Sequence, residues 1–246
     1  MLRGIYNFFL SLKTSIWLLA GILLLLLAGA VIMPGHEEFQ GLHTVPLFPW
    51  LAGNEPRLTW WLWGSVALLC LLMLNTVACS IESVFRKWTA RKWLLIISPQ
   101  IIHIGFLLIL LAHLLSSTGS YRNMAFAYRD SVVQLPNGIE VLFRDIRTQI
   151  DPSGYITDWA ADIEYSAGGN LLGRDSILPN SPSFRDGFEL NIRTIRVAPF
   201  PVAMVEVSRE PGAPWALAGG LCFLAGTAVL LVLKVRRDEV LENRDL

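Results

Sequence analysis

The sequence is poor in charged residues and in cysteine. Only 16% of its 246 residues are charged, whereas 53% are hydrophobic, and this balance excludes an ordinary soluble domain. The formal net charge is zero, so no positive excess is available to neutralise a phosphate backbone and nucleic-acid binding is excluded. Cys70, Cys79 and Cys222 stand far apart in apolar runs, which excludes a CxxC or zinc pattern and indicates small core residues.

The motifs of common hydrolases and nucleotide-binding enzymes are also missing. The sequence contains no GxSxG, HExxH or P-loop motif, and no GxGxxG after a strand. The long segment 118–213 has neither histidine nor cysteine, and paired acids such as Asp158 and Asp162 look like surface residues. Proteolysis and phosphoryl transfer therefore have no recognisable machinery, and the catalytic residues stay unknown.

Long apolar runs take the place of these motifs. About 20 apolar residues cross a bilayer as a helix, and windows of this size without a charged residue occur at 14–33, 60–79, 94–115 and 215–233. They predict an integral membrane α-helical protein with four transmembrane helices in a lipid bilayer. Ala28-Gly29-Ala30 resembles a signal-peptide cleavage site, but the long first apolar stretch favours a retained helix.

The positive charges predict the orientation of these helices. All four lysines, Lys13, Lys87, Lys92 and Lys234, fall in the segments 1–13, 80–93 and 234–246. The positive-inside rule then places both termini in the cytoplasm and residues 34–59 and 116–214 on the periplasmic side of a bacterial inner membrane. Tryptophans mark the ends of the spans, where they are expected to be interfacial anchors: Trp60, Trp61, Trp63 and Trp215 on the outer side, and Trp88 and Trp93 on the inner side.

The segment between the third and fourth spans has the pattern of a small β-rich domain. Short, mostly alternating runs occur at 132–133, 139–143, 161–165, 188–192 and 202–204. Turn residues separate them at 136–138, 151–154, 168–170 and 186–187. We therefore expect a membrane region at 1–117, an extracytoplasmic β domain at 118–213, a fourth transmembrane helix at 214–234 and a cytoplasmic tail at 235–246. Without cysteine, this domain depends on packing for its stability.

Two of the four histidines lie inside the third span. Polar residues at this depth are costly and usually functional, so His103 and His113 are candidates for haem-iron ligation or a proton relay. The alternative is a neutral imidazole that is hydrogen-bonded to a neighbouring helix. Ten residues of helix correspond to about 15 Å of rise and about 280° of rotation, so the two side chains cannot bind opposite faces of one iron and a single haem needs a ligand from elsewhere. His36 and His43, beside Glu37 and Glu38, have the pattern of surface residues, with metal or haem binding as the alternative.

Two further residues lie near these positions. Asn75, in the second span, is expected to hydrogen-bond across helices, and contact with a ligand is the alternative. Gly105 beside His103 would admit a close-packed helix or a flat ring, of which helix packing is the simpler interpretation.

The order of several short motifs resembles the ResB/CcsB family of cytochrome c biogenesis. These motifs are Ser11-Leu12-Lys13 before the first span, 74–79 (Leu-Asn-Thr-Val-Ala-Cys) in the second, 103–108 (His-Ile-Gly-Phe-Leu-Leu) in the third, and 209–212 (Arg-Glu-Pro-Gly) before a glycine-rich last span. The resemblance extends over essentially the whole chain. Each motif has low specificity by itself, and the order in which the motifs occur carries the resemblance.

This resemblance implies a haem-delivery component that works with a CcsA-type membrane partner and attaches haem to apocytochrome c. In the family a histidine of the third span helps bind haem, and His103 occupies that position; the cofactor is haem b, in transit or bound in the membrane. The resemblance implies that thioether formation occurs mainly on the partner, whereas His113 matches no family motif.

The outer domain is shorter than in many members of the family. It therefore need not bind apocytochrome in the way that the larger domains do. Two other classes of protein remain open: a cytochrome b-like electron-transfer subunit, and a structural assembly subunit that binds no haem.

Overall fold

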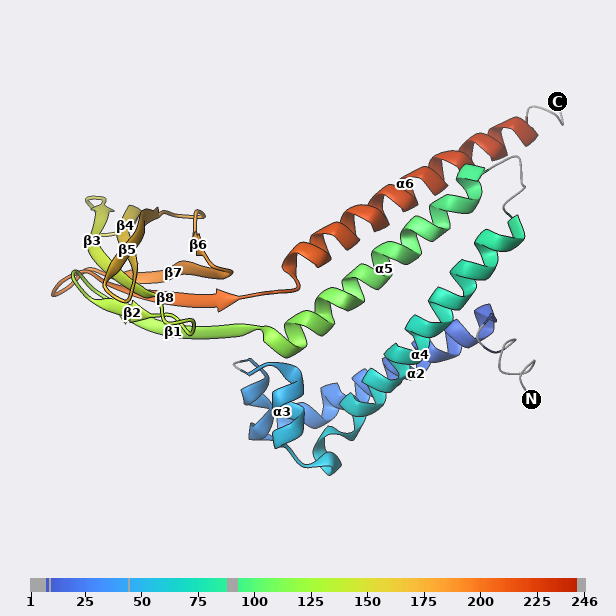
Figure 1. Ribbon diagram of the computed structural model, residues 1–246, viewed down its shortest axis with the longest axis horizontal. Coiled ribbons are helices and arrows are strands. Elements are labelled where there is room, and N and C mark those ends of the chain that lie inside the picture. Colours follow the sequence, from blue (N-terminus) through green and yellow to red (C-terminus); the bar gives the residue numbers. More distant parts are fainter. Residues whose placement is uncertain (1–7, 9, 44, 88–92, 243–246) are drawn as a thin grey trace. The chain divides into compact units, whose positions relative to one another are not determined.

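The computed structural model describes residues 8, 10–43, 45–87 and 93–242 (Figure 1). It divides into a helical unit, residues 1–42, 47–118 and 212–246, and a β unit, residues 43–46 and 119–211. Each unit has its own hydrophobic interior, and each is considered by itself below.

Four long helices form the helical unit. They are α2 (Leu12–Ile32), α4 (Pro56–Lys87), α5 (Trp93–Gly119) and α6 (Ala213–Glu242), and the connection between α2 and α4 contains η1 (Met33–Gly35), η2 (Glu37–His43) and α3 (Leu47–Gly53). All four long helices have the length and apolar composition to cross a membrane. The four predicted apolar windows are confirmed as helices, and each helix except α2 is longer than its apolar window at both ends. Trp88, one of the predicted anchors, lies outside the described residues.

Helices α5 and α6 run side by side along a stripe of small residues (Figure 1). On the α6 side the stripe is Gly212, which directly precedes the helix, and Gly219 and Gly226 within it, at intervals of seven residues. On α5 the facing residues are separated alternately by four and three positions: Ser98, Ile102, Gly105, Ile109, Ala112 and Ser116. A spacing of 3.5 residues keeps one face of a helix toward its neighbour, as in a left-handed coiled coil. Small residues allow the two backbones to approach closely, which is how apolar helices associate where no water drives them together.

An aromatic cluster joins α2, α4 and their connection. Trp61 packs on the backbone of Gly29, where a Cβ would collide with its ring, and it lies near Phe39 and Trp50 with 3% of its surface exposed. Trp60 and Trp63 are exposed. The three neighbouring tryptophans therefore differ: two are free to act as the predicted anchors, whereas Trp61 belongs to the core of the unit.

The β unit is a pair of four-stranded antiparallel sheets. One sheet has the order β1-β8-β7-β6 and the other β2-β3-β4-β5. The strands are β1 (Tyr121–Ala127), β2 (Val132–Gln134), β3 (Glu140–Ile150), β4 (Ile156–Ala167), β5 (Asn170–Ile177), β6 (Ser183–Arg185), β7 (Phe188–Arg196) and β8 (Val202–Arg209). Alternate residues of the long strands face inward and make one apolar core, which includes Val141, Ile163, Leu190 and Val205.

Five of these eight strands contain the predicted runs, and the predicted turn segments connect β2 to β3, β3 to β4, β4 to β5, and β6 to β7. Gly138, Gly154 and Gly187 adopt positive φ values of 84°, 89° and 81° there, a conformation that favours glycine. Strands β1, β5 and β6 were not predicted. The sequences of β1 and β5 lack a regular polar alternation, and β6 has only three residues.

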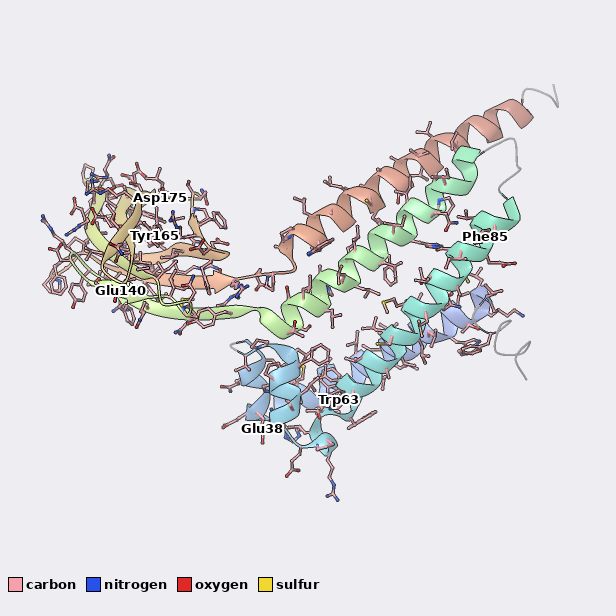
Figure 2. The ribbon with its side chains drawn as sticks, in the orientation of Figure 1. Glu38, Trp63, Phe85, Glu140, Tyr165 and Asp175 are labelled. Carbon is pink, nitrogen blue, oxygen red and sulfur yellow. The ribbon has the colours of Figure 1, made fainter. Side chains whose placement is uncertain are left out.

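A chain of polar side chains, buried at Tyr165 and Ser183 and exposed at Asp175, connects three strands. The Tyr165 hydroxyl lies 2.6 Å from Ser183 Oγ, which donates a 2.5 Å hydrogen bond to Asp175. Figure 2 labels Tyr165 and Asp175 on their strands. Burial raises the pKa of the Tyr165 phenol, so this hydroxyl stays protonated at neutral pH. These bonds tie the short edge strand β6 to β4 and β5 of the other sheet.

Each sheet also carries one glutamate between two arginines. In one sheet Glu164 pairs with Arg144 and Arg174, at 2.8 and 2.7 Å. In the other, Arg193 donates two hydrogen bonds to Glu206, at 2.6 and 3.0 Å.

Arg122 lies 3.4 Å from the same Glu206 carboxylate. Both Arg144 and Arg193 occur at register shifts of their strands, so each is the extra residue of a β-bulge that directs a guanidinium toward the adjacent strand.

Substitution of Gly219 is expected to separate α5 from α6. A Cβ at this position would lie 2.7 Å from the carbonyl oxygen of Gly105 and 3.0 Å from the backbone nitrogen of Ile109, so Gly219→Ala must move backbone. Overpacking of this kind costs about 1–3 kcal/mol. Gly220→Ala is the matched control, because its Cβ meets nothing within 4 Å. Thermal unfolding of the full chain in detergent checks this prediction, and equal stability of the two variants would contradict it.

Arg193→Ala is expected to destabilise the β unit more at pH 7 than at pH 4. The hydrogen bonds from Arg193 lower the pKa of Glu206 below its ordinary value of 4.5, and the charges of Arg193 and Arg122 add to this effect. The carboxylate therefore stabilises the fold above pH 4.5, and this contribution is lost as the pH falls through the lowered pKa. Removing Arg193 leaves a buried carboxylate with the weaker partner, at a cost of roughly 2–4 kcal/mol at neutral pH.

Hydrogen exchange of the β7 and β8 amides in the full chain measures this loss. Arg193→Ala combined with Glu206→Gln should recover part of it, since the unpaired charge is then absent. A loss of the same size at both pH values, with no recovery in the double variant, would show that the ion pair is unimportant.

Candidate functional site

Helix α5 places His103 against α4. The ring is half-buried, and its Nδ1 atom lies 2.7 Å from the hydroxyl oxygen of Ser80. Three residues further along α5, Phe106 packs on the cluster of Leu18, Ile22 and Leu72 from α2 and α4. Residues three apart share a helix face, so the face of α5 that holds His103 and Phe106 lies toward α4, and the glycine stripe lies toward α6.

This hydrogen bond determines what the imidazole can do. Within the described part of the chain, His103 Nε2 makes no hydrogen bond. If Nδ1 carries the proton and donates it to Ser80, Nε2 presents a lone pair, which is the arrangement of a histidine that binds a metal. If Ser80 donates instead, Nε2 carries the proton. The geometry therefore fits both a ligand and a packing histidine, the two possibilities that the sequence left open.

His113 is in a different environment. It lies in the same span, 10 residues after His103, and its side chain is exposed in this chain. The two imidazoles are therefore not brought together. If either imidazole binds a haem iron, the second ligand of that iron must come from another residue. His113 stays a prediction as the weaker haem candidate.

Asn75 joins α4 to α2. Its side chain is 1% exposed, and Ser15 Oγ donates a 2.5 Å hydrogen bond to its Oδ1 atom. The expected interhelical hydrogen bond is thereby confirmed. A second polar contact, between Ser80 and His103, joins α4 to α5.

Gly105 packs on α6. A Cβ there would lie 2.6 Å from the carbonyl oxygen of Gly219 and 2.7 Å from the nitrogen of Phe223, so α6 fills the space beside it. The simpler of the two interpretations, helix packing, is the one the structure has. A flat ring that is bound by His103 would have to lie on the other side of α5.

Three polar residues of this region are not among those predicted from the sequence. Ser80 follows the second apolar window directly, and no local pattern marks it as a partner for a histidine. Ser98 and Gln100 lie within the third span, and their Oγ and Oε1 atoms are buried without a hydrogen-bond partner among the described residues. Polar residues inside an apolar window are the signal that could have identified Ser98 and Gln100, as it did Asn75.

The remaining histidines and acids do not form a metal site in the described part of the chain, where no three His, Cys, Asp or Glu side chains come together. His36 is exposed, with its Nδ1 atom 3.9 Å from Glu38, as expected of a surface residue. The side chain of His43 lies outside the described residues.

Among the hollows on the described surface of the β unit, two are lined by charged or aromatic side chains. Mutually paired charges, including Arg144, Glu164 and Arg174, line one of them, so its main charged groups are already satisfied. The hydrogen bond from Arg144 lowers the pKa of Glu164, which excludes it as a proton donor near pH 7. Tyr128 and Phe200 line the other hollow, of about 350 Å³, with ring centroids 6.3 Å apart. In the first hollow the Ser176 hydroxyl donates a 2.6 Å hydrogen bond to Asp162, but Arg147 also pairs with that carboxylate, at 2.9 Å.

Comparisons with known proteins show similarity among solved structures alone. No model of a protein family matches the sequence, and no curated protein matches it. Among solved structures, one described as the cytochrome c haem lyase CcmF is similar, with 19% sequence identity and a TM-score of 0.46. The similarity covers 85% of this chain and 34% of that chain, so this protein spans about one third of the length of CcmF. A TM-score of this size assigns no function to the protein.

The contact between Ser15 and Asn75 should stabilise the helical unit. Interhelical hydrogen bonds in membranes contribute about 0.5–1.5 kcal/mol, so we expect a coupling free energy of this size between Ser15→Ala and Asn75→Ala in a double-mutant cycle. Reversible unfolding in detergent micelles measures it. Asn75→Ala should cost more than Ser15→Ala because Asn75 is completely buried. Additive losses in the double variant would show that the two side chains do not interact.

Proposed function

We propose that this protein handles haem in the membrane during cytochrome c assembly, and that His103 binds the haem iron through Nε2. The proposal rests on the environment of the His103 imidazole. This imidazole lies within an apolar span, with Nδ1 hydrogen-bonded to Ser80 and Nε2 without a hydrogen bond in the described chain. Ionisable residues within a membrane are usually functional, and neutral imidazole is the commonest protein ligand of haem iron.

The residues around His103 fit a haem that is bound from one side. The Ser80 hydroxyl can accept a hydrogen bond from Nδ1, which leaves the Nε2 lone pair for iron. Helix α6 closes the Gly105 side of α5, so the porphyrin would lie on the opposite side of this helix. Haem supplies an iron that accepts the imidazole and vinyl groups that react with the cysteines of an apocytochrome.

A second axial ligand must come from a partner protein. His113 lies about 15 Å further along the same helix and cannot reach the opposite face of that iron. The resemblance of the sequence to ResB/CcsB proteins favours a CcsA-type membrane partner for this role. In this proposal haem b is the cargo, apocytochrome c is the acceptor, and the thioether bonds form mainly on the partner.

The same proposal gives the protein an orientation. Both termini lie in the cytoplasm of a bacterium, four helices cross the inner membrane, and the β unit lies in the periplasm. The enrichment of lysine in 1–13, 80–93 and 234–246 supports this arrangement, since positive residues are retained on the cytoplasmic side.

The reduced-minus-oxidised absorbance spectrum of the protein, purified with its membrane partners, tests the proposal. We expect a haem signal in the native complex and in His113→Ala, and loss of most of that signal in His103→Ala, because His103 lies within a span with its Nδ1 atom held by Ser80 and Nε2 directed to no protein partner in the described chain. Covalent cytochrome c in the cells should fall in parallel. His113→Ala is the matched control, since it removes an imidazole from the same helix.

Other results would favour a different function. An unchanged spectrum in His103→Ala would eliminate this residue as a ligand. Stable, reducible haem without a defect in cytochrome c maturation on deletion would favour an electron-transfer subunit. A maturation defect without haem in the complex would favour a structural assembly subunit.

A further inference from the structure

Ser80 uses its side chain differently from three other hydroxyl residues of α4, whereas a fourth, Ser83, makes no side-chain hydrogen bond in the described structure. Thr59, Ser65 and Thr76 each donate a hydrogen bond to the carbonyl four residues earlier, at 3.1, 2.8 and 2.8 Å. This is the usual arrangement of a hydroxyl in an apolar helix. Ser80 makes no such bond in the described structure, and its Oγ atom lies 2.7 Å from Nδ1 of His103. Its hydrogen-bonding capacity therefore serves the imidazole and not its own helix.

A hydroxyl differs from the usual partners of a metal-binding histidine. A carboxylate or a backbone carbonyl can only accept a hydrogen bond, so it keeps the proton on the ring nitrogen beside it and leaves the other nitrogen permanently ready for metal. Serine can donate or accept, because its hydroxyl hydrogen rotates. The Ser80 hydroxyl can therefore satisfy Nδ1 in either tautomer of His103.

We propose that Ser80 is the positioning residue that allows His103 to bind haem and to release it, by reversing the direction of their hydrogen bond. Without haem, Ser80 donates to Nδ1 and Nε2 carries the proton. With iron on Nε2, the proton is on Nδ1, and the Ser80 oxygen accepts a hydrogen bond from Nδ1–H. One proton leaves Nε2 and one arrives at Nδ1, so the protein gains or loses no proton and no electron.

This inference rests on the proposed function and gives it a physical reason. A buried polar atom that loses its partner is costly, and here Nδ1 keeps the same partner in both states. Neither loading nor release of haem then leaves Nδ1 unpaired. A ligand of this kind suits a protein that passes haem on, whereas a carboxylate partner would suit one that keeps it.

The hydrogen bond can be observed directly by nitrogen NMR. The full chain with His36→Gln, His43→Gln and His113→Gln has one labelled imidazole, that of His103. Zinc protoporphyrin IX serves as the probe, because it is diamagnetic and takes a single imidazole. We expect the proton on Nε2 without the probe and on Nδ1 with it. Ser80→Ala should weaken the preference for the first tautomer.

Haem binding provides an independent measurement. Removing a hydrogen-bonding partner of a metal ligand typically lowers metal affinity 10–100-fold, so Ser80→Ala should weaken ferric haem binding on the order of ten-fold and raise the midpoint potential of the bound haem. Ser80→Thr retains the hydroxyl and should restore both values. Thr76→Val is the matched control, because it removes a hydroxyl from the same face of α4 that is bonded to its own helix.

The outcomes separate this inference from the proposed function. The inference is wrong if Ser80→Ala keeps the native haem affinity and midpoint potential, or if Nδ1 carries the proton before the probe is added. In either case a loss of haem in His103→Ala would still support the proposed function. If the native chain with its partners binds no porphyrin, the function fails and the reversal fails with it. If Ser80→Ala does not fold, Ser80→Thr and the NMR experiment on the native serine decide the question.

Discussion

The helical unit depends on one constraint: a polar group inside an apolar bundle must find its partner within the protein. Water is not available there, and each unpaired group is costly. Between helices of the described structure two contacts meet this requirement, one between Ser15 and Asn75 and the other between Ser80 and His103, whereas Ser98 and Gln100 each keep a buried oxygen without a partner. The two contacts connect α2 to α4 and α4 to α5. Between α5 and α6 the connection is steric, since Gly105, Gly219 and Gly226 bring the two backbones together.

The β unit meets a different requirement, because it has no disulfide and few residues with which to build a core. Its two sheets bury alternate apolar residues against each other. The outer faces are stabilised by a repeated device, a glutamate held by arginines from both neighbouring strands. A β-bulge supplies one arginine of each set, so the irregularities of the two sheets serve the same purpose.

Much of the fold could be predicted because its signals are local. The four apolar windows and the turns with Gly138, Gly154 and Gly187 depend on residue types that are close together in the sequence. The strands β1, β5 and β6 could not be predicted, since pairing with strands distant in the sequence selects them. For the site, the histidines were evident as polar residues in an apolar run. Ser80 was not, because its importance comes from another helix.

The sequence alone determined the class of the protein, the number of its apolar helices, the β-rich character of its third connection and the depth of His103 in a span. These follow from composition and spacing, which need no knowledge of neighbours. Tertiary structure alone decided that Ser80 pairs with Nδ1 of His103, that Gly105 lies against α6, and that Trp61 is buried although Trp60 and Trp63 are exposed. Each of these depends on which helix face lies against which, and residues far apart in the chain determine that packing.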